Sequence, residues 1–86
     1  MKAKYTMGPW HYEPADGFYG EIVNAGGDCV ATFVDEPSVQ NAMLLTAAPE
    51  LLGALILMVL RAEEAGYPDG KCLEMARAAI AKATGE

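Results

Sequence analysis

The hydrophobic and polar residues of this chain follow the period of a strand first and the period of a helix later. Three short segments rich in aromatic and β-branched residues favour strands, the first of them with one apolar face. They are residues 10–13, 18–23 and 28–34. The segments between them, 14–17 and 24–27, hold the proline, glycine, asparagine and aspartate typical of tight turns. Tight turns join antiparallel neighbours, so the pattern predicts a three-stranded antiparallel β-meander.

Helical spacing of the apolar residues begins after the third predicted strand. Asp35 is suited to cap a first helix, with Pro37 in the first turn and an end near Thr46 or Ala47. Pro49 prevents this helix from continuing, because proline lacks an N–H donor and its ring crowds the preceding turn. Proline is, however, well accommodated in the first turn of a new helix. The sequence therefore predicts two successive helices in this region.

The last two helices are predicted over residues 49–65 and 70–84. Gly66 can adopt the left-handed angles of a helix C-cap, and Asp69 can cap the helix that follows. Because the loop between them is short, these two helices should be antiparallel neighbours. The predicted fold class is α+β, with a three-stranded antiparallel β-meander followed by three helices, the last two forming an antiparallel helical hairpin packed on the sheet.

The second predicted helix is apolar on more than one face. Between residues 51 and 60 every residue except Gly53 has an apolar side chain. A helix that is apolar on both faces must be buried on both. One face can meet the sheet, and the other needs a second helix or a second copy of the chain. The candidates for self-association are Leu52, Ile56, Val59 and Leu60.

Length and charge narrow the class of protein. Eighty-six residues correspond to a single α+β domain over residues 1–86, with the β-meander at about 10–34 and the helical layer at about 36–84. The net charge of −6 argues against direct binding to nucleic acid. The uninterrupted apolar run is about half of the ~20 residues that a membrane span requires. We therefore expect a cytoplasmic protein with no membrane partner, in which Cys29 and Cys72 are free thiols.

Residues that could carry out chemistry are few. His11 is the only histidine, and Glu13 could pair with it for acid–base catalysis, but no nucleophile motif accompanies them. The histidine and the two cysteines do not have the spacing of metal ligands. The sequence predicts no enzyme activity, no cofactor and no metal site. The alternative is a small enzyme that uses His11.

Residues that could bind a partner are more numerous. Aromatic side chains gather in the first predicted hairpin, where Trp10 is expected in the core and two tyrosines are more open. The acidic side chains of the helical region form either solvated helix ends or a patch that mimics the charge of nucleic acid. The candidates for partner binding are Tyr12, Tyr19, Glu63, Glu64, Asp69 and Glu74.

Residues 41–55, which read NAMLLTAAPELLGAL, resemble a segment of small phage and prophage proteins that typically reads NARLIAAAPELLEAL. Those proteins often carry Gly-Pro-Trp near the N-terminus, matched by residues 8–10, and end in an alanine-rich helix, matched by residues 76–85. The chain departs from the pattern with Met43 in place of arginine, Thr46 in place of alanine and Gly53 in place of glutamate. The changes at Met43 and Gly53 replace charges, so they make its helical region more apolar than the pattern.

The resemblance implies a phage- or prophage-encoded accessory protein and brings no set of catalytic residues with it. We expect it to act by binding an unknown host or phage protein, and a more specific version of this expectation is an inhibitor of a host defence complex. A homodimer is compatible with the apolar second helix. The alternative is a self-associating structural protein or a component of the virion.

Overall fold

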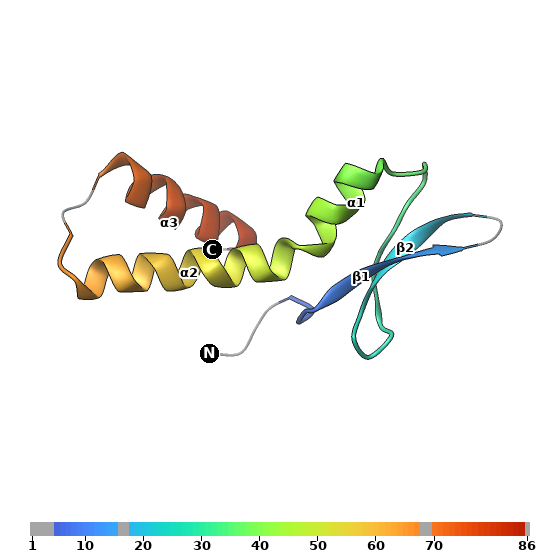
Figure 1. Ribbon diagram of the computed structural model, residues 1–86, viewed down its shortest axis with the longest axis horizontal. Helices are drawn as coiled ribbons and strands as arrows, with labels where there is room; N and C mark the ends of the chain where they lie inside the picture. The colour runs from blue at the N-terminus through green and yellow to red at the C-terminus, as the bar shows by residue number, and fades with distance from the viewer. Residues whose placement is uncertain (1–4, 16–17, 68–69, 86) are drawn as a thin grey trace. The chain divides into compact units, whose positions relative to one another are not determined.

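A computed structural model describes residues 5–15, 18–67 and 70–85 of the chain (Figure 1). Three strands are followed by three helices, which confirms the predicted α+β class. The strands are β1 (Trp10–Ala15), β2 (Phe18–Asn24) and β3 (Cys29–Thr32). The helices are α1 (Val39–Thr46), α2 (Ala48–Glu64) and α3 (Lys71–Thr84).

The chain divides into two compact units, Met1–Glu50 and Leu51–Glu86. The first unit contains the sheet and α1, which contacts β1. The second contains most of α2 and all of α3. The single domain over residues 1–86, and the packing of the last two helices on the sheet, stay predictions.

The sheet is an antiparallel meander with β2 in the centre. Tyr12 of β1 and Ala31 of β3 are both register partners of Ile22, whose side chain is 2% exposed. β1 continues past the predicted end through Pro14, with a shift in register between Glu13 and Ala15. An edge strand tolerates proline at such an irregularity, because no neighbour requires its missing N–H.

The turn between β2 and β3 forms where the sequence predicted it. The Asn24 side chain accepts hydrogen bonds from the backbone N–H groups of Gly26 and Asp28, at 3.0 and 2.9 Å. Gly27 adopts a φ of 85°, an angle that glycine reaches without steric cost. The tip of the first predicted turn, Asp16 and Gly17, lies outside the described residues.

Two predicted boundaries around the start of α1 are wrong. β3 ends at Thr32, and Val34, expected in the strand, is 88% exposed. Ser38 caps α1 in place of Asp35, because its Oγ accepts a hydrogen bond from the N–H of Asn41 at 3.1 Å. Pro37 consequently precedes the helix. The predicted end of α1 at Thr46 is confirmed.

Individual residues set the start and end of α2 and the start of α3. Glu50 lies in the first turn of α2, one residue after Pro49, as predicted. Gly66 has a φ of 74° and donates its N–H to the Glu63 carbonyl at 3.1 Å. The Tyr67 N–H bonds the Ala62 carbonyl at the same distance, which completes a Schellman cap. Asp69 lies outside the described residues, and the N-cap position of α3 is held by Gly70.

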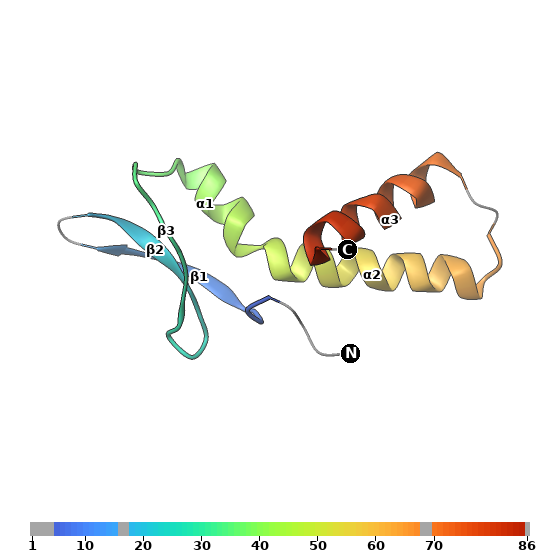
Figure 2. The same ribbon diagram turned by 180° about the vertical axis from the view of Figure 1, so that it is seen from behind.

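Helix α3 returns beside α2 to form a hairpin, as both ribbon views show (Figures 1 and 2). An ion pair at 3.1 Å joins Arg77 of α3 to Glu63 of α2. Val59 lies one turn before Glu63 on the same side of α2, and its side chain is 7% exposed. The side of α2 centred on Val59 therefore faces α3.

Helical spacing in the sequence predicts that the apolar stripe of α3 consists of Cys72, Met75, Ala76, Ala79, Ile80 and Ala83. The partly buried side of the helix shares only part of this stripe. Leu73, Ala76 and Ile80 are partly buried. Cys72 and Met75, expected in the buried stripe, are exposed. Alanines lie on more than one side of α3, so the sequence alone does not say which side is buried. The packing of α3 beside α2 decides this.

Among the described residues, no single helix is long and apolar enough to cross a membrane. Helices α1 and α2, as a bent pair, do meet the criterion of length and composition together.

Candidate functional site

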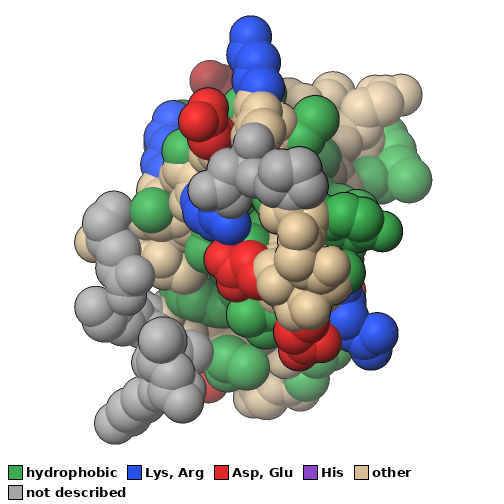
Figure 3. Space-filling view, turned by 90° about the vertical axis from the view of Figure 1, so that its left-hand side faces the viewer, with side chains coloured by type: hydrophobic (Ala, Val, Ile, Leu, Met, Phe, Trp, Pro, Cys, Tyr) green, Lys and Arg blue, Asp and Glu red, His purple; other side chains and the backbone are tan. Residues whose placement is uncertain are grey.

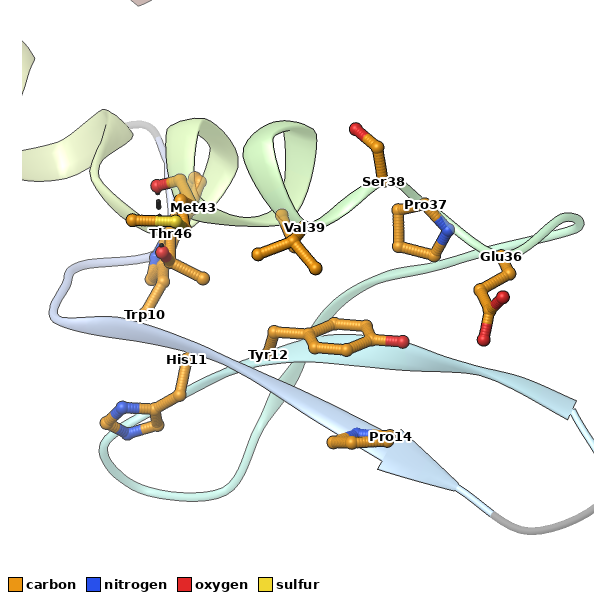
Figure 4. A pocket seen from close by; sticks show the side chains of 11 residues that line it. Trp10, His11, Tyr12, Pro14, Glu36, Pro37, Ser38, Val39, Met43 and Thr46 are labelled. Carbon is orange, nitrogen blue, oxygen red and sulfur yellow. Dashed lines mark hydrogen bonds between the residues drawn. The ribbon is translucent and has the colours of Figure 1, made fainter.

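An open groove of about 770 Å³ lies between β1 and α1 in the first unit (Figure 4). Its walls come from three consecutive parts of this unit: the strand, the segment before the helix, and the helix itself. The strand contributes Trp10, Tyr12 and Pro14. The segment before the helix contributes Pro37, and α1 contributes Val39 and Met43.

The alternation of β1 places its aromatic side chains in the groove. Trp10 and Tyr12 are two residues apart and point toward α1, whereas the side chain of His11, which also lines the groove, points away from α1 (Figure 4). Ile22 pairs with Tyr12 across the strands, so its buried side chain lies on the same face. Ala42 of α1 is also buried and lines the groove. The groove thus has a firm apolar base.

Both aromatic side chains are held in place by contacts within the first unit. The indole N–H of Trp10 donates to the carbonyl of Thr6 at 3.2 Å. The Tyr12 ring meets the edge of Phe33, with 5.7 Å between the ring centroids and an interplanar angle of 69°. Rings fixed in this way lose little conformational entropy when a ligand covers them.

The helical wall of the groove is more open. Val39 and Met43 lie one turn apart on α1 and are 70% and 65% exposed. Such side chains gain most from being covered by a partner, because most of their apolar area still faces water. A methionine also adapts its shape to an incoming side chain.

Of the predicted partner-binding residues, the structure places only Tyr12 in this groove. The side chain of Tyr19, like Asp69, lies outside the described part of the structure. Glu63, Glu64 and Glu74 belong to the second unit, where Glu63 is paired with Arg77. Sequence reasoning missed Val39 and Met43, whose only signal was their i, i+4 spacing on a predicted helix.

The self-association candidates divide between two environments. Val59 is buried, and Leu52 and Ile56 are partly buried on the same side of α2. Leu60 is 48% exposed. A second copy of the chain would therefore find most of these four side chains already covered.

The described residues offer little for catalysis or metal binding. His11 is exposed, and no group of three histidine, cysteine or acidic side chains within residues 5–15, 18–67 and 70–85 could hold a metal ion. Cys29 and Cys72 are both free, as predicted, and both are exposed. The pKa of the Cys29 thiol is raised, first because it donates a hydrogen bond to the Glu21 carboxylate and then because of desolvation and the negative charge of that carboxylate.

Comparison with known proteins gives one match. The model of a family described as Salmonella phage P22 protein Y8K6 matches residues 1–86. No curated protein and no solved structure matches the chain significantly. The family match covers the whole sequence and agrees with the resemblance to small phage proteins. The chain belongs to the family of Salmonella phage P22 protein Y8K6.

Proposed function

We propose that this phage protein is a non-enzymatic accessory protein that acts by binding another protein, and that the β1–α1 groove is the binding surface. The observation that supports the proposal is the open groove with two fixed aromatic rings on one wall and exposed apolar side chains on the other. Aromatic residues and methionine are enriched in the buried centres of protein interfaces. Apolar concave surfaces with few polar groups bind ligands mainly by excluding water.

The lining also indicates what kind of segment would fit. Pro14 and Pro37 lack a backbone N–H, so these parts of the wall offer side-chain surface in place of backbone hydrogen bonds. Glu36 is the acidic residue among those that line the groove. A partner segment with an apolar anchor and a neighbouring lysine or arginine is therefore complementary to it.

A more specific version makes the partner a host defence complex that the protein inhibits. In that version the net charge of −6 helps the protein to compete for a basic surface. The binding would then weaken steeply with salt, because screening shortens the range of charge interactions. Binding that depends on the groove but not on salt would support an accessory protein and contradict charge mimicry.

The experiment is affinity capture of the tagged full chain from host lysate, with and without infection, at low and moderate salt. The test variant is Val39→Glu combined with Met43→Glu, which places two charges on the exposed wall. Both positions face solvent on a helix that accepts glutamate, so the fold should persist. The matched control is Val34→Glu, at a position that is 88% exposed and outside the groove.

We expect a stoichiometric partner that is retained by the control and lost by the groove variant. Equal capture by the wild type, the control and the groove variant would contradict the proposed surface. The enzyme alternative predicts instead that His11→Ala abolishes the phenotype. We expect His11→Ala to weaken partner capture less than the groove variant does, because the imidazole lines the groove but points away from the apolar wall on α1 (Figure 4).

A further inference from the structure

We propose that two copies of the chain dimerise through α2, packed antiparallel to α2 of the second copy on the face opposite Val59. This surface is separate from the β1–α1 groove. Three observations on α2 support it: uncovered apolar side chains, an unexplained glycine, and two opposite charges placed for a two-fold arrangement.

The face of α2 away from α3 is apolar and uncovered. Leu51, Leu57 and Met58 are 54%, 61% and 68% exposed, although they lie within the most apolar segment of the chain. Ala54 and Leu57 are about 140° and 160° around the helix from Val59. Leu57 and Met58 also line a shallow hollow at the end of this face. Hydrophobic side chains reach the surface beside charged ones in the space-filling view (Figure 3).

Within the described part of the chain, no close contact explains Gly53. It lies inside α2, where glycine is unfavourable because it loses more backbone entropy than other residues. A Cβ atom added at Gly53 would meet nothing within 4 Å. The absence of a side chain is useful, however, where a second helix approaches closely. Gly53 and Ala54 together provide such a flat place on the exposed side of α2.

Glu50 and Arg61 provide the charge complementarity. Glu50 lies in the first turn of α2 and Arg61 in the last, and both are exposed. Among the described residues, neither forms an ion pair. Eleven residues place them about 20° apart around the helix and about 16 Å apart along it. They therefore lie at the two ends of one stripe, with Ala54 and Leu57 between them.

An antiparallel two-fold pairing brings these charges together twice. If the axis passes midway along the stripe, Glu50 of each copy lies beside Arg61 of the other, and Ala54 lies beside Leu57. A two-fold interface uses the same patch on both copies, so one stripe is sufficient to form it. Antiparallel helices also oppose their dipoles favourably. A parallel pair would place Glu50 next to Glu50 and Arg61 next to Arg61.

The uncovered area suits a second copy of the chain. The exposed parts of Leu51, Leu57, Met58 and Leu60 amount to roughly 300 Å² per copy at about 30 Å² per buried carbon. Two copies therefore bury roughly 600 Å² of apolar side chain, and even with the backbone at Gly53 and the stems of the charged side chains the contact has the size of a weak, transient interface. The expected dimer is therefore reversible.

The test is sedimentation velocity of the full chain between about 1 and about 100 µM, the range in which an interface of this size should associate. We expect Leu57→Glu to weaken the dimer at least about 30-fold, because it places a charge in the apolar centre. Gly53→Leu should weaken it as well while raising the helicity of the monomer, because leucine favours helix. That combination excludes misfolding as the cause. The control is Val34→Glu, which should not change the dimer.

Charge reversal tests the orientation. Glu50→Arg and Arg61→Glu should each weaken the dimer roughly tenfold, because either change turns two attractive pairs into two repulsive ones. The double variant should return to within about threefold of the wild type. Each reversal also places a charge unfavourably in the field of the helix dipole, which lowers the stability of the helix. These losses add in the double variant. A recovery of dimer affinity can therefore come only from pairing of the two charges across the interface.

Several outcomes would overturn the proposal. A monomer at every concentration excludes the dimer. A dimer that persists with Leu57→Glu uses another surface, and a double variant weaker than both single variants excludes the antiparallel arrangement. Monomers that sediment with lipid vesicles would assign the face to a membrane. If the protein is monomeric and a cysteine introduced by Leu57→Cys does not react with maleimide, this face of α2 is covered by the first unit of the same chain.

Discussion

Replacing Ile22 by valine removes one methylene from the most buried side chain of the sheet. Ile22 is 2% exposed and lies on the central strand, opposite Tyr12 on one side and Ala31 on the other. Transfer of one methylene from the interior to water costs ~0.8 kcal/mol. The small void that remains adds to this cost because its surroundings relax only in part. We expect a loss in the free energy of unfolding of about 1 kcal/mol.

A loss of this size is readily measured in so small a protein. Typical stability per residue gives roughly 4–13 kcal/mol for a chain of this length. With a urea m-value of ~1 kcal/mol/M, the midpoint of unfolding should fall by about 1 M. The corresponding fall in Tm is about 4–8 °C.

Fluorescence of Trp10 is the appropriate probe of this change. It is the only tryptophan of the chain, and it lies on β1 in the same unit as Ile22. The protein concentration must be equal for all variants, because a dimer links apparent stability to concentration. The control is Val34→Ala, whose side chain is 88% exposed and should change stability by no more than about 0.5 kcal/mol. An Ile22→Val midpoint equal to that of the wild type, or to that of the control, would refute the assignment of Ile22 to the core.

Three further predictions follow from local contacts. Ser38→Ala should lower the free energy of unfolding by about 1 kcal/mol, because it removes the capping hydroxyl of α1; an unchanged urea midpoint would show that the cap is unimportant. Gly66→Ala should lower it by about 1–2 kcal/mol, measured by circular dichroism during melting, because a φ of 74° crowds a Cβ atom; equal melting would contradict this. Glu21→Gln should lower the raised pKa of Cys29 and so speed the alkylation of this thiol at about pH 8. Cys72 in the same chain serves as the internal reference. An unchanged ratio of the Cys29 and Cys72 alkylation rates would exclude the Glu21 contact.

The boundaries that the sequence alone determined are those set by backbone chemistry. Pro49 lies in the first turn of α2, and Gly66 ends that helix at a positive φ. Asn24 and Gly27 form the turn between β2 and β3. In each case one residue has a conformational or hydrogen-bonding property that its neighbours lack. Such information is local, so it can be read without the rest of the fold.

Where two nearby residues offered the same chemistry, the sequence did not decide between them. Asp35 and Ser38 can both cap a helix, and Ser38 does so in the structure. The apolar residues of the third predicted strand continue to Val34, although pairing ends at Thr32. The exact start of α1 and the end of β3 depend on how α1 packs on β1, which involves residues far apart in the chain.

The candidate sites depended on tertiary structure in the same way. Tyr12 was predicted as a binding residue from its aromatic character, but the groove exists only because α1 places Val39 and Met43 opposite it. Residues 51–60 of α2 are apolar on every side, so this part of the sequence contains no period that says which side is inside. In the structure Val59 is buried and Leu57 is exposed. A uniform pattern leaves several packings equally favourable, and only contacts between distant segments select one.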